Sequence, residues 1–146
     1  MRIIAGDFKG RKIEAPEGFD VRPTTDKVKE ALFSIIQNEL YDAVCVDLFS
    51  GTGNLGLEAL SRGAKSCYFG DNSRLSINII KKNIESIHPG RVNGSEAHVV
   101  FGDFAKTLEQ VKKREEYADI IFVDPPYDKN LYVKVLEKIS EYFRCK

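Results

Sequence analysis

Long apolar runs, paired cysteines and an excess of either charge are all missing from this sequence. No apolar run approaches the ~20 residues of a membrane helix, and the first residues lack the apolar core of a signal peptide. Lysine plus arginine balance aspartate plus glutamate at 22 each, so the whole chain is no polycation. The three cysteines, Cys45, Cys67 and Cys145, are odd in number and lack metal-ligand spacing, which favours free thiols. These absences indicate a soluble protein of the reducing cytoplasm, without contact to membranes or a bound metal.

Positive charge, although balanced overall, is concentrated at the amino terminus. Residues 1–12 contain Arg2, Lys9, Arg11 and Lys12 against the single acid Asp7. A local excess of this kind indicates contact with an anion such as phosphate. A solvated basic hairpin also accounts for it, and charge alone favours that simpler interpretation.

The first forty residues predict a hairpin followed by a helix. Short strands are predicted over Arg2–Ala5 and Arg11–Glu14, with glycines between them. Threonine and aspartate at 24–26 supply helix-start chemistry. The apolar residues that follow have the i, i+3, i+4, i+7 spacing of an amphipathic helix with one face toward the core, namely Val28, Ala31, Leu32, Ile35, Ile36 and Leu40.

From residue 44 the pattern alternates between strand and helix. The predicted elements are the strands Val44–Phe49, Ser66–Gly70, Ala97–Phe101 and Ala118–Val123, and the helices Asn54–Ser61, Arg74–Ile87, Phe104–Glu116 and Leu131–Phe143. Four successive βα units predict an α/β fold with a parallel sheet, a Rossmann-like three-layer sandwich. We expect one domain over 1–146, with a basic extension at 1–20 and a catalytic core at 21–146. Such sheets normally gain strands after the last helix, so the core is predicted to be incomplete, with its fourth strand at a bare edge.

A glycine-rich loop follows the first core strand. Gly51, Gly53 and Gly56 fit the G-x-G-x-x-G pattern between a strand and a helix, and Asp71 stands twenty residues after Gly51. Glycines permit a tight turn and let a ligand approach the backbone, while the acid suits ribose hydroxyls. This pattern is typical of dinucleotide enzymes. A tight turn with a solvated acid is the structural alternative.

Acidic residues end or nearly end all four predicted core strands: Asp47, Asp71, Asp103 and Asp124. A carboxylate-lined edge repels phosphates and suits a ligand with an ammonium group, ribose hydroxyls and an adenine amino group. S-adenosylmethionine carries all three. Aspartates also cap helices, which explains Asp103 or Asp71 singly but all four less well.

The fourth strand ends in Asp124-Pro125-Pro126-Tyr127. Neither proline donates a hydrogen bond, so a carboxylate, two carbonyls and a ring are held stiffly there. A carboxylate and a carbonyl accepting the hydrogens of a base's exocyclic amine would stabilise developing positive charge on its nitrogen. The ring would stack on an unpaired or extruded base. This corner therefore favours methylation of an amine, and a proline-rich strand exit without catalysis is the alternative.

Several runs together resemble the RsmD family of bacterial small-subunit ribosomal RNA guanine-N2 methyltransferases. They are Arg2–Gly6 with Gly10-Arg11, Arg22-Pro23-Thr24 with Lys29–Phe33, Asp47–Gly53 with Leu55–Ala64, and Asp124–Tyr127. The Leu55–Ala64 run is the most specific of them, because Asp-Pro-Pro-Tyr is shared by many amino-methyltransferases. The resemblance covers essentially the whole chain. One departure is Asp71, where the family usually has glutamate.

The resemblance implies a role for each matching position. Asp47, Ser50, Gly51 and Gly53 would line the methionine end of S-adenosylmethionine, Asp71 would hold the ribose, and Asp103 with Phe104 the adenine, with Phe49 and Asn72 completing the cofactor set. Asp124, Pro125, Pro126 and Tyr127 would hold the guanine amine. Arg2, Lys9, Arg11, Lys12 and Arg22 would grip the RNA backbone. Glu58 is expected to be structural or solvated.

The leading prediction is thus a monomeric methyltransferase acting on ribosomal RNA or an assembling small subunit. An adenine-N6 or other amine methyltransferase on DNA or RNA has the same corner. A nicotinamide-dependent oxidoreductase would keep the glycine loop but leave the corner unexplained. A non-catalytic RNA-binding module would bind RNA without responding to S-adenosylmethionine.

Overall fold

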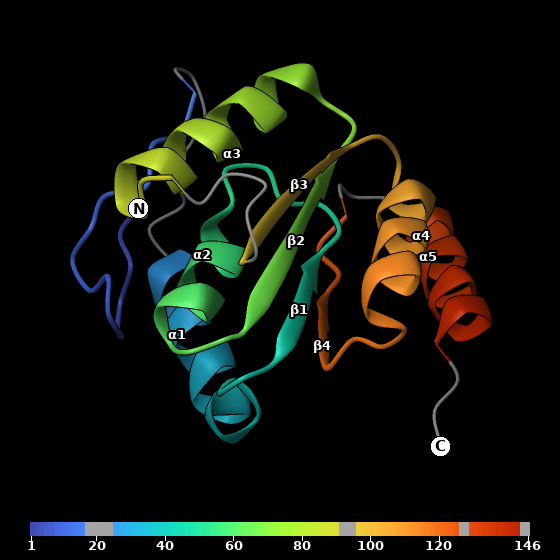
Figure 1. Cartoon of the computed structure of the whole chain (residues 1–146), viewed down its shortest axis with the longest axis horizontal. Coiled ribbons are helices and arrows are strands. Elements are labelled where there is room, and N and C mark those ends of the chain that lie inside the picture. The colour runs from blue at the N-terminus through green and yellow to red at the C-terminus, as the bar shows by residue number, and fades with distance from the viewer. Residues whose placement is uncertain (17–24, 91–95, 126–128, 144–146) are drawn as a thin grey trace.

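Strands and helices alternate from residue 44 onward in the computed structural model, which describes residues 1–16, 25–90, 96–125 and 129–143 (Figure 1). The elements are α1 (Thr25–Ile36), the short 3-10 helix η1 (Gln37–Glu39), β1 (Val44–Asp47), α2 (Asn54–Ser61), β2 (Ser66–Asp71), α3 (Arg74–Ile87), β3 (Ala97–Phe101), α4 (Phe104–Glu115), β4 (Ile120–Phe122) and α5 (Lys129–Tyr142). The βα order that the sequence predicts is confirmed.

The four strands form one sheet in the order β3-β2-β1-β4, and every neighbouring pair is parallel. In the central strand, Cys45 stands opposite Cys67 of β2 and Ile120 of β4. The α/β class with a parallel sheet is therefore confirmed, and β4 lies at an edge of the sheet as predicted. Because all strands run the same way, their carboxyl ends lie along one edge.

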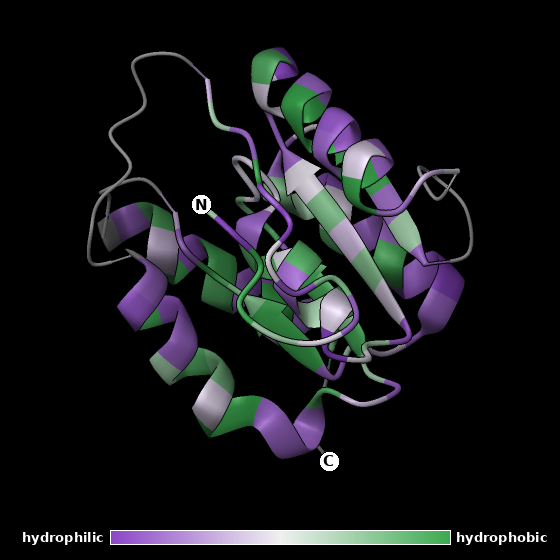
Figure 2. Cartoon of the chain, turned by 90° about the vertical axis from the view of Figure 1, so that its left-hand side faces the viewer, coloured by the Kyte–Doolittle hydropathy of each residue, from purple (hydrophilic) through white to green (hydrophobic). Residues whose placement is uncertain are grey.

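Helices cover both faces of this sheet, which gives three layers (Figure 1). One buried cluster joins Cys45 and Cys67 to side chains of α1, α2 and α3, among them Phe33 and Ile80. The second joins the alternate strand residues to α4 and α5, as in the packing of Val46 with Leu108 and Val135. Figure 2 shows the hydrophobic residues of the sheet gathered between the helices. Full burial of β1 explains its lack of polar alternation.

The amino-terminal hairpin is a correction, because the described structure has no strand over Arg2–Ala5 or Arg11–Glu14. A single antiparallel bridge joins Arg2 to Lys12. The backbone N–H groups of Ile4 and Ala5 donate instead to the carboxylate of Glu58 on α2. Backbone bonds such as Ile3 N–H to the Arg11 carbonyl still join the two halves of the segment, but no regular strand ladder forms.

The buried face of α1 is corrected only in part. Leu32 and Ile36 pack against the core as the spacing predicts, but Val28 and Ile35 are 64% and 78% exposed. Lys29 and Phe33 are buried in their place, at 1% and 0%. Lys29 is buried because its ammonium reaches a buried carboxylate, Glu58, at 2.9 Å. An ion-pair partner far along the chain thus modifies the apolar pattern.

Smaller differences concern strand ends and thiols. β4 is shorter than the predicted Ala118–Val123. Asp119 lies before it, because its carboxylate accepts from the Val44 N–H and its own N–H donates to the Val44 carbonyl. Cys45 and Cys67 are free and buried, and Cys145 lies outside the described residues. Among the helices that the structure describes, none combines the length and apolarity of a membrane span.

Candidate active site

The carboxyl edge of the sheet brings the predicted acids together. Asp47 and Asp71 are the last residues of β1 and β2. Asp103 and Asp124 each follow their strands, β3 and β4, by two residues. All four therefore stand at the one edge where ligands bind in open α/β sheets.

The loop between β1 and α2 makes a tight turn at this edge. The Ser50 N–H donates to the carbonyl of Gly70 at 3.0 Å, and the Gly53 N–H donates to the carbonyl of Ser50 at 2.8 Å. Gly51 and Gly53 have φ of 58° and 86°, the left-handed region that favours glycine. Among the described residues, apart from Gly51 itself and its two chain neighbours, no atom lies within 4 Å of the place where a Cβ of Gly51 would stand. A ligand can therefore approach the backbone there.

The third glycine of the motif has a packing role. A Cβ on Gly56 would lie 2.3 Å from the Phe69 ring and 2.7 Å from the sulfur of Cys67. Only glycine lets α2 approach β2 so closely. The start of α2, and with it the loop, is thereby fixed on the sheet.

Asp47 lies beneath the loop and is almost completely buried, at 2% exposure. Its Oδ2 accepts a hydrogen bond from the Gly56 N–H at 3.3 Å. Burial, followed by the negative charges of Asp124 and Asp71, raises the pKa of Asp47 to about 7. A carboxyl group with these neighbours is stabilised in its charged form by a nearby cation. A contact with a ligand's ammonium group stays a prediction, because the observed partner is the first turn of α2.

Asp71 locks the loop from the neighbouring strand. Its Oδ2 accepts from the Gly51 N–H at 3.0 Å, and its Oδ1 accepts from the Ser73 N–H at 2.9 Å. The hydroxyl of Ser73 in turn caps α3 by accepting from the Ser76 N–H. Asp71 thus holds the loop now, and each oxygen keeps a lone pair for a ribose hydroxyl.

Asp103 caps a helix, as the alternative interpretation holds. Its side chain is exposed and accepts from the Lys106 N–H at 2.9 Å at the start of α4. The rings of Phe104 and Phe49 lie beside each other, with 6.2 Å between their centroids. Asn72 is exposed at the end of β2. These residues border the same edge, and their contact with a cofactor stays a prediction.

The proline corner adjoins the glycine loop because β4 pairs directly with β1. Phe122 stands in register with Asp47, and Asp124 follows two residues later. Asp124 is exposed, and Pro125 is partly buried. Pro126 and Tyr127 lie outside the described residues. The corner and the loop are therefore neighbours across one pair of strands.

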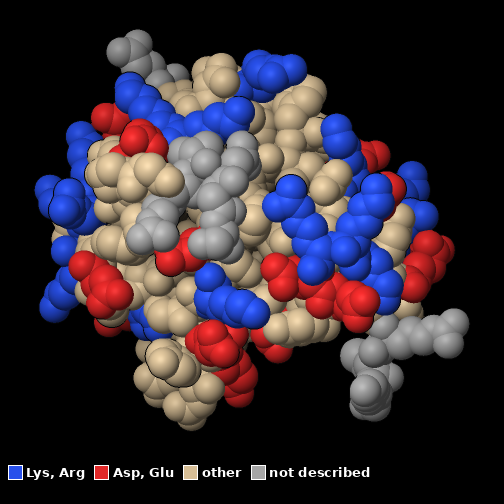
Figure 3. All heavy atoms as spheres, viewed as in Figure 1, with Lys and Arg blue, Asp and Glu red and all other residues tan. Residues whose placement is uncertain are grey.

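The basic side chains of the amino-terminal segment, residues 1–14, face solvent. Arg2, Lys9, Arg11 and Lys12 are all exposed. Figure 3 shows lysines and arginines along the side of the molecule where Figure 1 places this segment. Arg22 lies outside the described residues. In the described part of the chain, no group of three or more His, Cys, Asp or Glu side chains is placed to hold a metal ion.

Comparisons with known proteins identify the family. The family model described as Conserved hypothetical protein 95 matches residues 1–144. YlbH of Bacillus subtilis (strain 168), a proposed rRNA methyltransferase, is 39% identical over 97% of this chain and 75% of that protein. The Ribosomal RNA small subunit methyltransferase D of Haemophilus influenzae is 34% identical over 97% and 71%. The chain belongs to the RsmD family.

Solved structures of other proteins share this fold. The Escherichia coli protein yhhF, a proposed methyltransferase, superposes with a TM-score of 0.81 at 34% identity, over 98% of this chain and 74% of that one. A SAM-dependent methyltransferase from Agrobacterium tumefaciens shares the fold, with a TM-score of 0.57 at 24% identity, over 73% of this chain and 33% of that one. The RsmD relatives are thus longer than this chain, which spans about three quarters of them.

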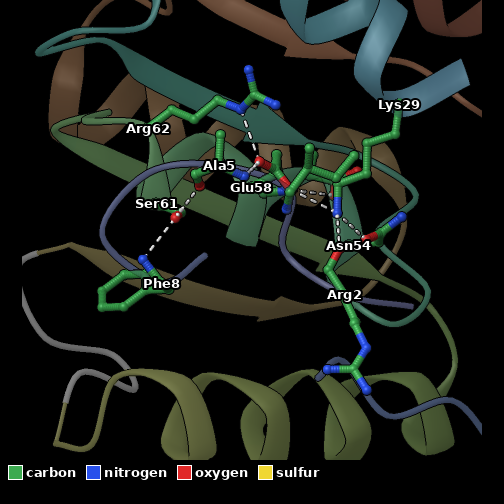
Figure 4. A network of polar contacts seen from close by, with 11 residues as sticks. Arg2, Ala5, Phe8, Lys29, Asn54, Glu58, Ser61 and Arg62 are labelled. Carbon is green, nitrogen blue, oxygen red and sulfur yellow. Dashed lines mark hydrogen bonds and ion pairs between the residues drawn. The ribbon is translucent and has the colours of Figure 1, made fainter. Parts of the chain in front are cut away.

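One group in this RsmD chain is missed by sequence reasoning: the buried network around Glu58 (Figure 4). Glu58 is 0% exposed and pairs with the Lys29 ammonium at 2.9 Å and the Arg62 guanidinium at 2.8 Å. It also accepts from the N–H groups of Ile4 and Ala5 at 2.8 and 3.1 Å.

The surroundings of Glu58 favour its charged form in the pair with Lys29. Burial opposes the charge of Glu58, but the Ile4 N–H and the two cations outweigh it and lower the pKa of Glu58. Burial lowers the pKa of Lys29, and Glu58 partly offsets this effect. The structure thus selects the structural role for Glu58. The only local signal in the sequence is Arg62, one helical turn after Glu58.

Proposed function

We propose that the protein transfers a methyl group from S-adenosylmethionine to the N2 amine of a guanine in small-subunit ribosomal RNA. The observation that carries the proposal is the pairing of β1 with β4. It sets the Asp124-Pro125 corner beside the loop that begins after Asp47. Relatives such as the Ribosomal RNA small subunit methyltransferase D of Haemophilus influenzae support this substrate class.

The residues present fit this cofactor. The open space at Gly51 admits a ligand to the loop backbone. The buried Asp47, with a pKa raised to about 7, gains from an ammonium group nearby. Asp71 has acceptor capacity left for ribose hydroxyls. The same acids oppose a pyrophosphate, so a nicotinamide dinucleotide fits less well.

The bound cofactor supplies an electrophilic methyl group on a sulfonium. In the transfer, the guanine N2 lone pair would form the new N–C bond as the C–S bond electrons leave on sulfur. The nitrogen would become positively charged and would then release a proton to water, which reaches the exposed Asp124. The Asp124 carboxylate and the Pro125 carbonyl would accept hydrogen bonds from its two hydrogens and stabilise that charge.

The exposed cations of the amino-terminal segment would position the RNA. Arg2, Lys9, Arg11 and Lys12 reach solvent without a carboxylate partner in the described ion pairs. Phosphate contacts position a nucleic acid without reading its sequence. The choice of guanine would therefore lie at the proline corner.

The test is incubation of pure protein with methyl-labelled S-adenosylmethionine and either assembled small subunits or naked small-subunit RNA. Digestion to nucleosides and mass spectrometry should give N2-methylguanosine. N6-methyladenosine would establish the adenine alternative. RNA binding without any label transfer on either substrate would point to the non-catalytic module and end the proposal.

A further inference from the structure

Asn83 of α3 ties the end of the amino-terminal segment to the glycine loop. Its Nδ2 donates to the carbonyls of both Glu14 and Thr52 at 2.9 Å. Its Oδ1 accepts from the Glu14 N–H at 3.0 Å. The side chain is 1% exposed, so no water replaces these partners without an opening of the structure.

Lys29 of α1 ties the start of the same segment to Asn54, the residue that directly follows the loop. Its ammonium donates to the carbonyl of Arg2 at 3.0 Å and to Asn54 Oδ1 at 2.6 Å, as Figure 4 shows. Asn54 is the first residue of α2, directly after Gly53. Lys29 is 1% exposed and Asn54 is 9% exposed.

The two attachments enclose the segment and the loop in one buried polar frame. Arg2 and Glu14 bound the basic segment, while Thr52 and Asn54 both lie where the loop meets α2. The segment has one strand bridge and five backbone hydrogen bonds of its own, but its position relative to the loop depends on such anchors. A change in the position of the loop must either carry the segment with it or leave buried amide and ammonium hydrogens unpaired, which is costly.

We propose that Asn83 and Lys29 are positioning residues that couple cofactor binding to RNA binding. The inference rests on the proposed function, because it takes the loop as the cofactor site and the segment as the RNA contact. A cofactor that orders the loop also fixes the basic segment, so that less ordering remains to be done when RNA binds. Linkage makes the effect reciprocal: RNA raises the affinity for the cofactor by the same factor.

Amide hydrogen exchange on the unmodified protein tests this first, without RNA. Adding S-adenosylhomocysteine should slow exchange at residues 50–56 and also at Ile4, Ala5 and Glu14. Slowing confined to 50–56 would overturn the coupling while leaving the cofactor site intact. No slowing at either place would remove the cofactor site itself and the inference with it.

A second experiment measures the coupling as a ratio. Calorimetry with S-adenosylhomocysteine, with and without a small-subunit RNA transcript, should show an affinity about tenfold higher with RNA. Asn83→Ala should bring that ratio close to one. An unchanged ratio in this variant, or a ratio of one in the unmodified protein, contradicts the proposal.

Lys82→Ala is the matched control. Lys82 neighbours Asn83 on α3 and contacts Glu14 through a surface ion pair of 3.2 Å, with both side chains more than half exposed. Its loss removes a cation but no buried anchor. RNA affinity can fall in this variant, while the ratio stays that of the unmodified protein. If Asn83→Ala does not fold, the exchange experiment decides alone.

Discussion

The glycine loop and the amino-terminal segment lie against the same helix, α2, but they are held in different ways. The loop is held mainly by backbone groups, including bonds to Gly70 and Asp71 of β2, and by glycines that no other residue replaces, as at Gly56. The segment is held largely by side chains that come from far along the chain, above all Glu58. A glycine motif thus shapes the loop, whereas remote buried charge fixes how the basic segment is attached.

The largest expected effect separates chemistry from structure. Asp124→Ala should lower the single-turnover rate of methyl transfer by about 10³-fold, because the acceptor for the amine hydrogens is lost. Affinity for S-adenosylhomocysteine and the unfolding midpoint should stay near those of the unmodified protein, since Asp124 is exposed. If the affinity for S-adenosylhomocysteine fell together with the rate, Asp124 would belong to the cofactor-binding part of the site, with the glycine loop.

The attachment of the segment should depend most on Glu58. Glu58→Ala leaves the Lys29 ammonium buried without its carboxylate, so we expect a loss of about 3–5 kcal/mol in the free energy of unfolding. Urea unfolding measures it. The control is Glu141→Ala, which removes one partner of the exposed pair with Lys138 and should cost less than about 1 kcal/mol. Equal losses in the two variants would contradict the role of burial.

Two glycines of the segment give a narrower comparison. Gly6 and Gly10 have similar φ, 90° and 85°, but a Cβ on Gly6 would meet the Ser61 carbonyl oxygen, whereas one on Gly10 has no atom within 4 Å. Gly10→Ala should cost only the strain of a left-handed residue, about 1–2 kcal/mol. Gly6→Ala should cost clearly more, as measured by urea unfolding. A smaller loss for Gly6→Ala would mean that the segment is not seated on α2.

The last comparison concerns the loop and pH. Since the pKa of Asp47 is about 7 when folded, against 3.8 as its ordinary value, the folded state keeps a proton that the unfolded state has lost between about pH 4 and 7. Stability therefore falls as pH rises through this range, and the fall is complete above it. Asp47→Asn removes this contribution.

We therefore expect Asp47→Asn to be more stable, relative to the unmodified protein, at pH 8 than at pH 4. Urea unfolding at both pH values measures this difference between the two proteins. A difference that is equal at both pH values, or that is larger at pH 4, would contradict the buried position of Asp47.

The core elements were predictable because their signals are local. α2 and α3 begin and end where the sequence predicts, since a glycine loop and a serine cap mark their starts. The edge of the sheet that gathers Asp47, Asp71, Asp103 and Asp124 follows from the parallel topology alone. The spacing of these four residues does not specify which ligand they bind.

The rest depends on partners that are distant in the sequence. The burial of Lys29 on α1 depends on a carboxylate partner that stands 29 residues later, so periodicity identifies Leu32 and Ile36 but wrongly includes Val28 and Ile35. The amides of Ile4 and Ala5, within one of the predicted strands, bond to Glu58, more than 50 residues away. Asn83 gave no signal, because a single polar residue on an amphipathic helix is usually solvated.

The two buried free thiols of the sheet are probes for opening of the core. Cys45 and Cys67 face each other on adjacent central strands, both with no exposed surface. Burial raises the pKa of Cys45 to about 12 and that of Cys67 well above its ordinary value, so neither forms the reactive thiolate in the folded protein. A thiol reagent reaches them only when the sheet opens. The rate at which these two sulfurs are modified therefore reports how often the whole core comes apart.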